Sequence, residues 1–282
     1  MTIPRSRRAR SSGSELRPAL LALLLAASPA AAQSVVPTSS DADAPICTDR
    51  PTKSNFACTV PRGQVQIEAD ALAWQNDVAG NSRSDQWALA SATYKYGLSG
   101  RTDIELAWAP LVSRRERGGA DVVTQTGISE ATVRLKQRLT ASDASVTAAL
   151  LPFLKLPLAP RGLGNRRVEG GVALPVNIAV PGGWTLTLGP QIDILADASG
   201  HGHHGGATML INVARQLGAF TLYSELWARR DWDPAGTVRQ HSADVAIAWL
   251  ATPRLQLDVG ANIGLDRATP GLVAYLGVAT RF

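Results

Sequence analysis

The sequence predicts an all-β protein, an antiparallel transmembrane β-barrel of about 12 strands that follows a cleaved signal peptide. Three observations carry this prediction: a secretory leader, alternation of apolar and polar residues along most of the remaining chain, and connections of alternating length. Hydrophobic residues make up 45% of the 282 residues, which is too many for a disordered chain. A mean hydropathy near zero excludes a bundle of membrane helices.

The leader is residues 1–32. Arginines are concentrated before residue 18, residues 19–27 (ALLALLLAA) are wholly apolar, and SPAAAQ follows. This order of a charged region, a short apolar region and an Ala-x-Ala site predicts a signal peptide cleaved after Ala32. The alternative, a buried helix of a cytosolic protein, fits the pattern less well, and nine apolar residues are too few to span a bilayer as a helix.

The leader also accounts for most of the basic excess. The chain carries 28 Lys and Arg against 23 Asp and Glu, and without residues 1–32 the balance is 23 against 22. A nucleic-acid partner is therefore not expected.

Residues 33–63 form a separate segment, rich in Ser, Pro and Asp and without periodicity. We interpret it as either a periplasmic strap or a plug in the lumen, between which the sequence does not decide. It contains both cysteines, Cys47 and Cys58. Because an exported chain meets an oxidising compartment, we expect them to form a local disulfide. The alternative is a pair of free thiols.

Alternation is clearest at 255–266. Six apolar residues from Leu255 to Leu265 alternate there with Gln, Asp, Gly and Asn. Successive side chains of a strand point to opposite faces, so this segment has one apolar and one polar face. The same pattern recurs in twelve segments: 64–75, 86–96, 102–112, 127–139, 145–156, 168–180, 184–195, 207–217, 219–230, 239–250, 254–265 and 272–282.

These segments of about 11 residues suit tilted strands that cross a bilayer. Short turns alternate with longer polar links such as 76–85 and 113–126, which is the layout of an outer-membrane barrel over residues 64–282. A soluble β-sandwich is the alternative. It is disfavoured because charges recur on the face opposite the apolar one, where a water-filled lumen would keep them hydrated. The apolar face would then contact outer-membrane lipids.

The charged residues of that polar face are the candidate lumen-lining set. They are Glu68, Asp70, Glu105, Arg134, Lys136, Arg138, Glu169, Asp193, Glu225, Asp244 and Asp258. Arg134, Lys136 and Arg138 form a basic ladder on one strand, which could guide an anionic solute. Mutual salt bridges that merely fill the interior are an equally good interpretation.

No catalytic, metal or cofactor site is expected. His201, His203 and His204 lie in the loop SGHGHHGG, which we interpret as a polar surface loop rather than a metal site. His241 and Ser242 are neighbours in a strand and point to opposite faces, so they cannot form a nucleophile–base pair. No G-x-S-x-G motif occurs.

Several motifs resemble a known family. They include Asp49-Arg50-Pro51 with Val60-Pro61 near the start, KYGLSGRTDIEL (95–106), LLPFLKLPLAP (150–160) and AYLGVATRF at the end. In these motifs the chain is similar to the outer-membrane transporters grouped as the MetA-pathway of phenol degradation family. The resemblance implies an outer-membrane barrel with a transport role and leaves the substrate open.

We therefore expect a monomeric outer-membrane channel for passive uptake of small aromatic or hydrophobic solutes. The C-terminal Phe282 is the kind of residue that the outer-membrane assembly machinery reads. The competing interpretation is a structural or surface-interaction barrel whose interior is sealed.

Overall fold

All the regular secondary-structure elements that occur in the described part of the chain are β-strands. A computed structural model describes residues 44–282, which belong to one compact unit. The predicted signal peptide, residues 1–32, lies outside the described residues. Within residues 44–282 no helix is long and apolar enough to cross a membrane.

Sixteen strands occur in residues 44–282. They are β1 (Val65–Ala79), β2 (Ser82–Ser99), β3 (Thr102–Trp108), β4 (Leu111–Gly118), β5 (Asp121–Gly127), β6 (Ala131–Arg138), β7 (Val146–Leu156), β8 (Glu169–Ala173), β9 (Val176–Val180), β10 (Trp184–Leu188), β11 (Gln191–Ala196), β12 (His203–Leu217), β13 (Phe220–Asp231), β14 (Val238–Thr252), β15 (Leu255–Gly264) and β16 (Leu272–Arg281).

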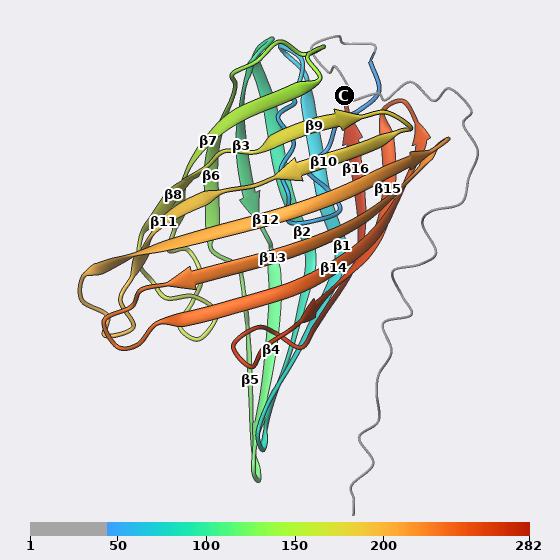
Figure 1. Cartoon of the computed structure of the whole chain (residues 1–282). Helices are drawn as coiled ribbons and strands as arrows, with labels where there is room; N and C mark the ends of the chain where they lie inside the picture. The colour runs from blue at the N-terminus through green and yellow to red at the C-terminus, as the bar shows by residue number, and fades with distance from the viewer. Residues whose placement is uncertain (1–43) are drawn as a thin grey trace, which may run out of the picture. The chain divides into compact units, whose positions relative to one another are not determined.

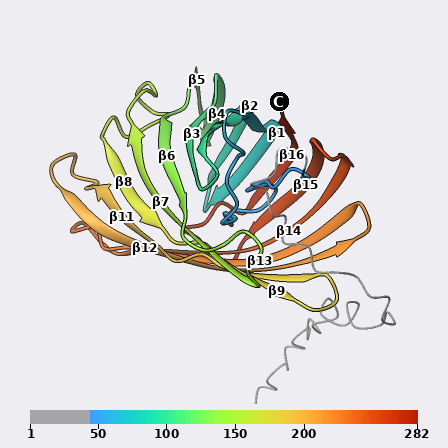
Figure 2. The ribbon, with the colours of Figure 1, turned by 90° about the horizontal axis from the view of Figure 1, so that it is seen from above.

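These strands make one closed antiparallel barrel of 12 strands, which confirms the predicted fold. Four pairs of consecutive elements, β3 with β4, β5 with β6, β8 with β9, and β10 with β11, are each two parts of one strand that share the same neighbours. The ring closes where β1 pairs with both β2 and β16 (Figures 1 and 2). A closed sheet has no edge with unpaired backbone groups, as a lipid environment requires.

Proline explains three of the four interruptions. Pro110 lies between β3 and β4, Pro175 between β8 and β9, and Pro190 between β10 and β11. Proline has no N–H to donate to a neighbouring strand, so the ladder breaks at each of these positions. The fourth break lies between β5 and β6. There the backbone N–H of Ser129 donates to the carbonyl of Ala109, which lies between β3 and β4, at 2.9 Å, and this bond links the two interrupted strands.

The two faces of the barrel wall have opposite polarity. On β14, Val245 is 50% and Trp249 is 44% exposed, whereas Ser242 and Asp244 are 1% exposed. Large exposed apolar side chains recur in this way on strands around the ring. Exposed apolar side chains distributed in this way are typical of barrels that span a membrane.

Two of the predicted polar links are strands. The links 76–85 and 113–126 continue as the paired ends of β1 with β2 and of β4 with β5, and Figure 1 shows β4 and β5 reaching beyond the other strands. Each hairpin turns at a glycine with positive φ, Gly80 and Gly119. Beyond the lipid a strand needs no apolar face, so the period-two signal ends while the backbone ladder continues.

An arginine on the lipid-facing side should destabilise the barrel according to its depth. Val259 lies mid-strand on β15 and is 44% exposed, and Val259→Arg is expected to lower the free energy of unfolding by about 2–4 kcal/mol. Leu265, just after β15, is the matched control, and Leu265→Arg should cost about 0–1 kcal/mol. Denaturant unfolding in lipid vesicles measures both; equal costs would contradict a bilayer around this strand.

Candidate functional site

Residues 45–63, called the plug below, run inside the ring of strands (Figure 2). Their backbone bonds largely to side chains of the wall instead of pairing as a strand. The N–H groups donate as follows: Asp49 to Glu68 at 3.0 Å, Lys53 and Ser54 to Glu225 at 3.1 and 3.0 Å, Ala57 to Asn177 at 2.7 Å, and Val60 to Asp103 at 2.8 Å. For residues 45–63 these contacts support the interpretation as a plug; residues 33–43 of the predicted segment lie outside the described residues.

The plug is also tied to itself and to β1. Cys47 and Cys58 form a disulfide with their Cα atoms 6.4 Å apart. The amide of Gln66 donates to the carbonyl of Cys47 at 2.8 Å, and the N–H of Phe56 donates to the Asp49 carboxylate at 2.7 Å. Residues 47–58 therefore form a closed loop held from both ends.

Arg50 is the most heavily paired side chain of the plug. Its Nε and Nη2 donate to the two oxygens of Asp258 at 3.1 and 2.7 Å, and its Nη1 donates to Asp70 at 2.6 Å. The guanidinium also lies 5.7 Å from the ring centre of Tyr275. Burial disfavours the charge, but the bonds to Asp258 and Asp70 outweigh it and raise the pKa of Arg50 above its ordinary value.

A glycine of the wall makes room for Arg50. A Cβ added at Gly277 on β16 would lie 1.8 Å from Nη2 of Arg50 and 2.4 Å from Oδ1 of Asp258. No side chain larger than hydrogen fits there while Arg50 keeps its place. The wall therefore provides both the space for the guanidinium and the carboxylates that pair with it.

The charge pattern is reversed one residue earlier. Asp49 is bound by Lys95 at 2.5 Å and by Lys136 at 2.6 Å. Burial opposes its ionisation, but Lys136 and Lys95 more than offset this and hold the pKa of Asp49 below its ordinary value. Because its folded-state pKa is depressed, this contribution to stability is present above the ordinary carboxyl pKa and is lost only as pH falls through the lower folded value.

Lys53 is the third charged anchor. Its Nζ lies 2.6 Å from Asp244 and 2.7 Å from the hydroxyl of Ser242, and 5.0 Å from the ring centre of Trp227. The Asp244 side chain is fully buried, so the ion pair is shielded from solvent on that side.

The structure divides the eleven predicted lumen residues into two groups. Seven belong to the network around the plug. Six of these contact the plug directly: Glu68, Asp70, Lys136, Glu225, Asp244 and Asp258. The seventh, Glu105, is linked to the plug through Lys136 and Lys95. Four are bonded elsewhere: Arg134 lies 3.8 Å from Glu105, Arg138 donates to the carbonyl of Gly100, Glu169 pairs with Lys155, and Asp193 accepts from Gln191.

The basic ladder is divided accordingly. Lys136 is 1% exposed between Asp49 and Glu105, and Arg138 is 6% exposed. Of the three residues only Arg134 keeps substantial side-chain exposure, 31%. Two of the three basic residues are therefore engaged, Lys136 with the plug and Arg138 with the turn after β2.

Several wall residues of the site were not among the lumen-lining candidates, and Lys95, Asp103 and Asn177 are examples. Asp103 and Glu105 are two positions apart on β3, so the period-two rule would have placed them on one face. Lys95 lies between two tyrosines and could have been found in the same way. Asn177 is a neutral residue that a search for charges passes over.

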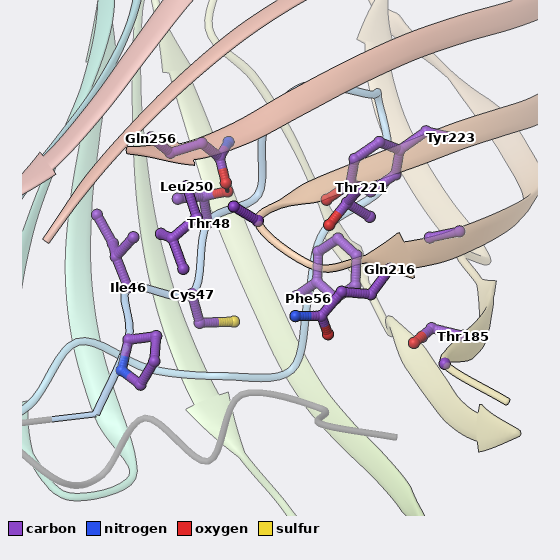
Figure 3. A pocket seen from close by; sticks show the side chains of 14 residues that line it. Ile46, Cys47, Thr48, Phe56, Thr185, Gln216, Thr221, Tyr223, Leu250 and Gln256 are labelled. Carbon is purple, nitrogen blue, oxygen red and sulfur yellow. Dashed lines mark hydrogen bonds between the residues drawn. The ribbon is translucent and has the colours of Figure 1, made fainter. Parts of the chain in front are cut away.

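Two cavities are lined partly by the plug and partly by the wall. The first has a volume of about 230 Å³ and is lined by Ile46, Cys47, Thr48 and Phe56 of the plug and by wall residues near the short turns. Figure 3 shows Ile46 and Phe56 on the plug side and Thr221, Tyr223 and Leu250 on the wall side. The second, about 240 Å³ and more polar, is lined by plug residues 49–50 and 52–55 and by Glu68, Asp70, Ser91, Ala92, Thr93, Ala107 and Arg134.

These features define a closed β-barrel of 12 strands with the plug inside it. Residues 48–282 match the model of the family described as "Putative MetA-pathway of phenol degradation", and the chain belongs to this family. The match begins at Thr48, so it includes the charged part of the plug.

Two solved structures share the fold. An outer membrane channel from Pseudomonas putida F1 is 14% identical with a TM-score of 0.60, covering 82% of this chain and 100% of that chain. The NanC porin is 8% identical with a TM-score of 0.50, covering 77% of this chain and 98% of that chain. No curated protein sequence matches the chain.

Disturbing the Arg50 anchor should loosen the plug. Arg50→Ala leaves Asp258 buried without its cation, at a cost of about 3–5 kcal/mol, and Gly277→Ala displaces the guanidinium. A loss of about 3 kcal/mol in the free energy that holds the plug raises the fraction of molecules with a displaced plug roughly a hundredfold. The rate at which a water-soluble phosphine reduces the Cys47–Cys58 disulfide in the folded barrel should rise accordingly.

The control is Gly118→Ala on the β4–β5 hairpin, where an added Cβ meets only Ser82 at an ordinary 3.6 Å. Its reduction rate should equal that of the wild type. Equal rates in all three variants would mean that Arg50 does not hold the plug.

Proposed function

We propose that the protein is a plugged outer-membrane channel for passive uptake of small solutes of the size of a single aromatic ring. It reaches the membrane through the signal peptide and works as a monomer. The observation that carries the proposal is the pair of cavities lined by the plug and the wall, inside a closed ring of 12 strands.

Barrel size supports a narrow path. Eight strands leave an interior that side chains fill, whereas sixteen or more leave an aqueous channel. A ring of 12 lies between these limits, so a segment as thin as the plug is enough to close it. The two cavities are space that the plug and the wall leave open.

The first cavity supports an aromatic or hydrophobic solute. An apolar cavity of 150 Å³ in another protein holds benzene, so about 230 Å³ is ample for one ring. Phe56, Ile46 and Leu250 offer apolar contact, and Thr48 and Gln256 offer polar partners for a ring substituent. The family's description, which names phenol degradation, supports such a solute.

No residue of the plugged lumen is assigned a catalytic role. Ser242 is 1% exposed and bound to Lys53, while His241 bonds to Asp266 at 2.8 Å. The contacts that Ser242 and His241 make support the interpretation that they do not act as a nucleophile and its base.

A sealed structural barrel is the second candidate function. It is favoured by the completeness of the plug's pairing, since Asp49, Arg50 and Lys53 each have a buried partner of opposite charge. The two functions differ in whether the plug ever leaves its place.

Planar-bilayer recording separates them. The wild type should give small, steady conductance, and Arg50→Ala combined with Lys53→Ala should raise the conductance severalfold because the plug loses two anchors. Arg115→Ala with Arg117→Ala, on the outer hairpin, removes the same charge away from the lumen and should leave conductance unchanged.

Flux of phenol, benzoate and glucose into liposomes then tests the solute. We expect phenol to enter faster than glucose through the double plug variant. If neither the wild type nor the variant conducts in the bilayer, the barrel is sealed and the second candidate function holds instead.

A further inference from the structure

Three metal-ligating groups converge at the long-loop rim, away from the plug. Asp197 follows β11, His204 lies at the start of β12, and Asp233 follows β13. His204 Nδ1 is 2.9 Å from Oδ1 of Asp197 and 3.6 Å from Oδ2 of Asp233. The three ligand atoms all lie within 4.8 Å of one another. Chain segments distant in sequence thus bring one nitrogen and two oxygens to one point.

The three side chains are largely enclosed. His204 is 8%, Asp197 13% and Asp233 10% exposed. The loop is built to allow this, because Gly200 and Gly202 have φ values of +77° and +87°, which L side chains rarely adopt. A Cβ at Gly202 would also lie 2.5 Å from Oδ2 of Asp197. The glycines of SGHGHHGG therefore position the ligand set rather than merely loosen the loop.

Asp233 is held in place independently of the imidazole. Its two oxygens accept backbone N–H groups, Oδ2 from Ala198 at 2.8 Å and Oδ1 from Ala235 at 2.7 Å. The carboxylate is therefore fixed in position by the backbone, beside the second carboxylate of Asp197.

One imidazole proton cannot serve both carboxylates. Nδ1 carries at most one hydrogen, and the distances of 2.9 and 3.6 Å show that Asp197 is its partner. Asp233 is left facing the ring nitrogen without that bond. A divalent cation between the three atoms would satisfy both carboxylates and the nitrogen lone pair at once.

We propose that Asp197, His204 and Asp233 bind a divalent transition-metal cation such as Zn²⁺. One imidazole nitrogen and two carboxylate oxygens are a ligand set that Zn²⁺ accepts, at about 2.0–2.2 Å, with water completing the coordination. The site ties three loop bases together and stabilises the long-loop rim. It lies at the ends of β11, β12 and β13, among residues that do not contact the plug, and does not depend on the transport function.

The proposal differs from binding by the histidine-rich loop as a whole. His203 is engaged otherwise, since its Nε2 lies 3.0 Å from the carbonyl oxygen of Val168, and His201 is exposed. Only His204 of the three faces the carboxylates. His241 pairs with Asp266 at 2.8 Å, but no second carboxylate completes a set there within the described residues, which makes it an internal control.

Calorimetric titration with ZnCl₂ tests the site, using the full barrel in detergent without an affinity tag. The wild type should bind one cation per chain and melt at a higher temperature with zinc than without it. His204→Ala and Asp233→Asn should each weaken binding roughly tenfold or more. The double variant His201→Ala, His203→Ala and the single variant His241→Ala should bind as the wild type does.

Two variants at different positions guard against loss of folding, and the folded fraction is checked by heat-dependent gel mobility. Binding that survives His204→Ala but is lost in the His201, His203 variant would place zinc in the loose loop and overturn the proposal. No binding at micromolar zinc by the folded wild type would overturn it as well.

Discussion

The structure depends on a match of charge between the plug and the inner face of the barrel. A barrel made of one sheet has no second apolar layer to fill its centre, and strand alternation makes its inner face polar. Buried charges there need partners of opposite sign or water. The plug supplies them, with Arg50 and Lys53 where the wall carries Asp258 and Asp244, and Asp49 where the wall carries Lys95 and Lys136.

The sign change between residues 49 and 50 also fixes the position of the plug. Sliding the segment by one residue in one direction would bring Arg50 to the two lysines, and sliding it in the other direction would bring Asp49 to the carboxylates, so like charges would meet in either case. Glycines complete the fit. A Cβ at Gly97 would lie 2.1 Å from the carbonyl oxygen of Pro61, so only glycine lets the chain pass from the plug into β1.

Local patterns predict the wall well and the plug poorly. Period two found every spanning strand because each strand meets lipid on one face and polar surroundings on the other. It ended too early in 76–85 and 113–126, where both faces meet water and the hairpins continue on backbone bonds alone. Arg50 and Asp258 are 208 positions apart, and no local periodicity links residues at that separation.

The loop histidines show the same limit. Their spacing predicts a polar surface loop. The two carboxylates that lie beside His204 come from Asp197 and from Asp233, which is on another loop. Tertiary contacts decide which histidine lies beside the carboxylates. The sequence shows that ligand types are present, and only the fold shows which of them meet.

Hydrogen–deuterium exchange of the wild-type barrel tests the central claim most directly. The N–H groups of Lys53, Ser54, Ala57 and Val60 belong to no strand, and each donates to a wall side chain. The account predicts that these four amides exchange slowly, at rates close to those of neighbouring strands. Exchange as fast as in an unstructured peptide would contradict it, because the plug would then not be held by the wall.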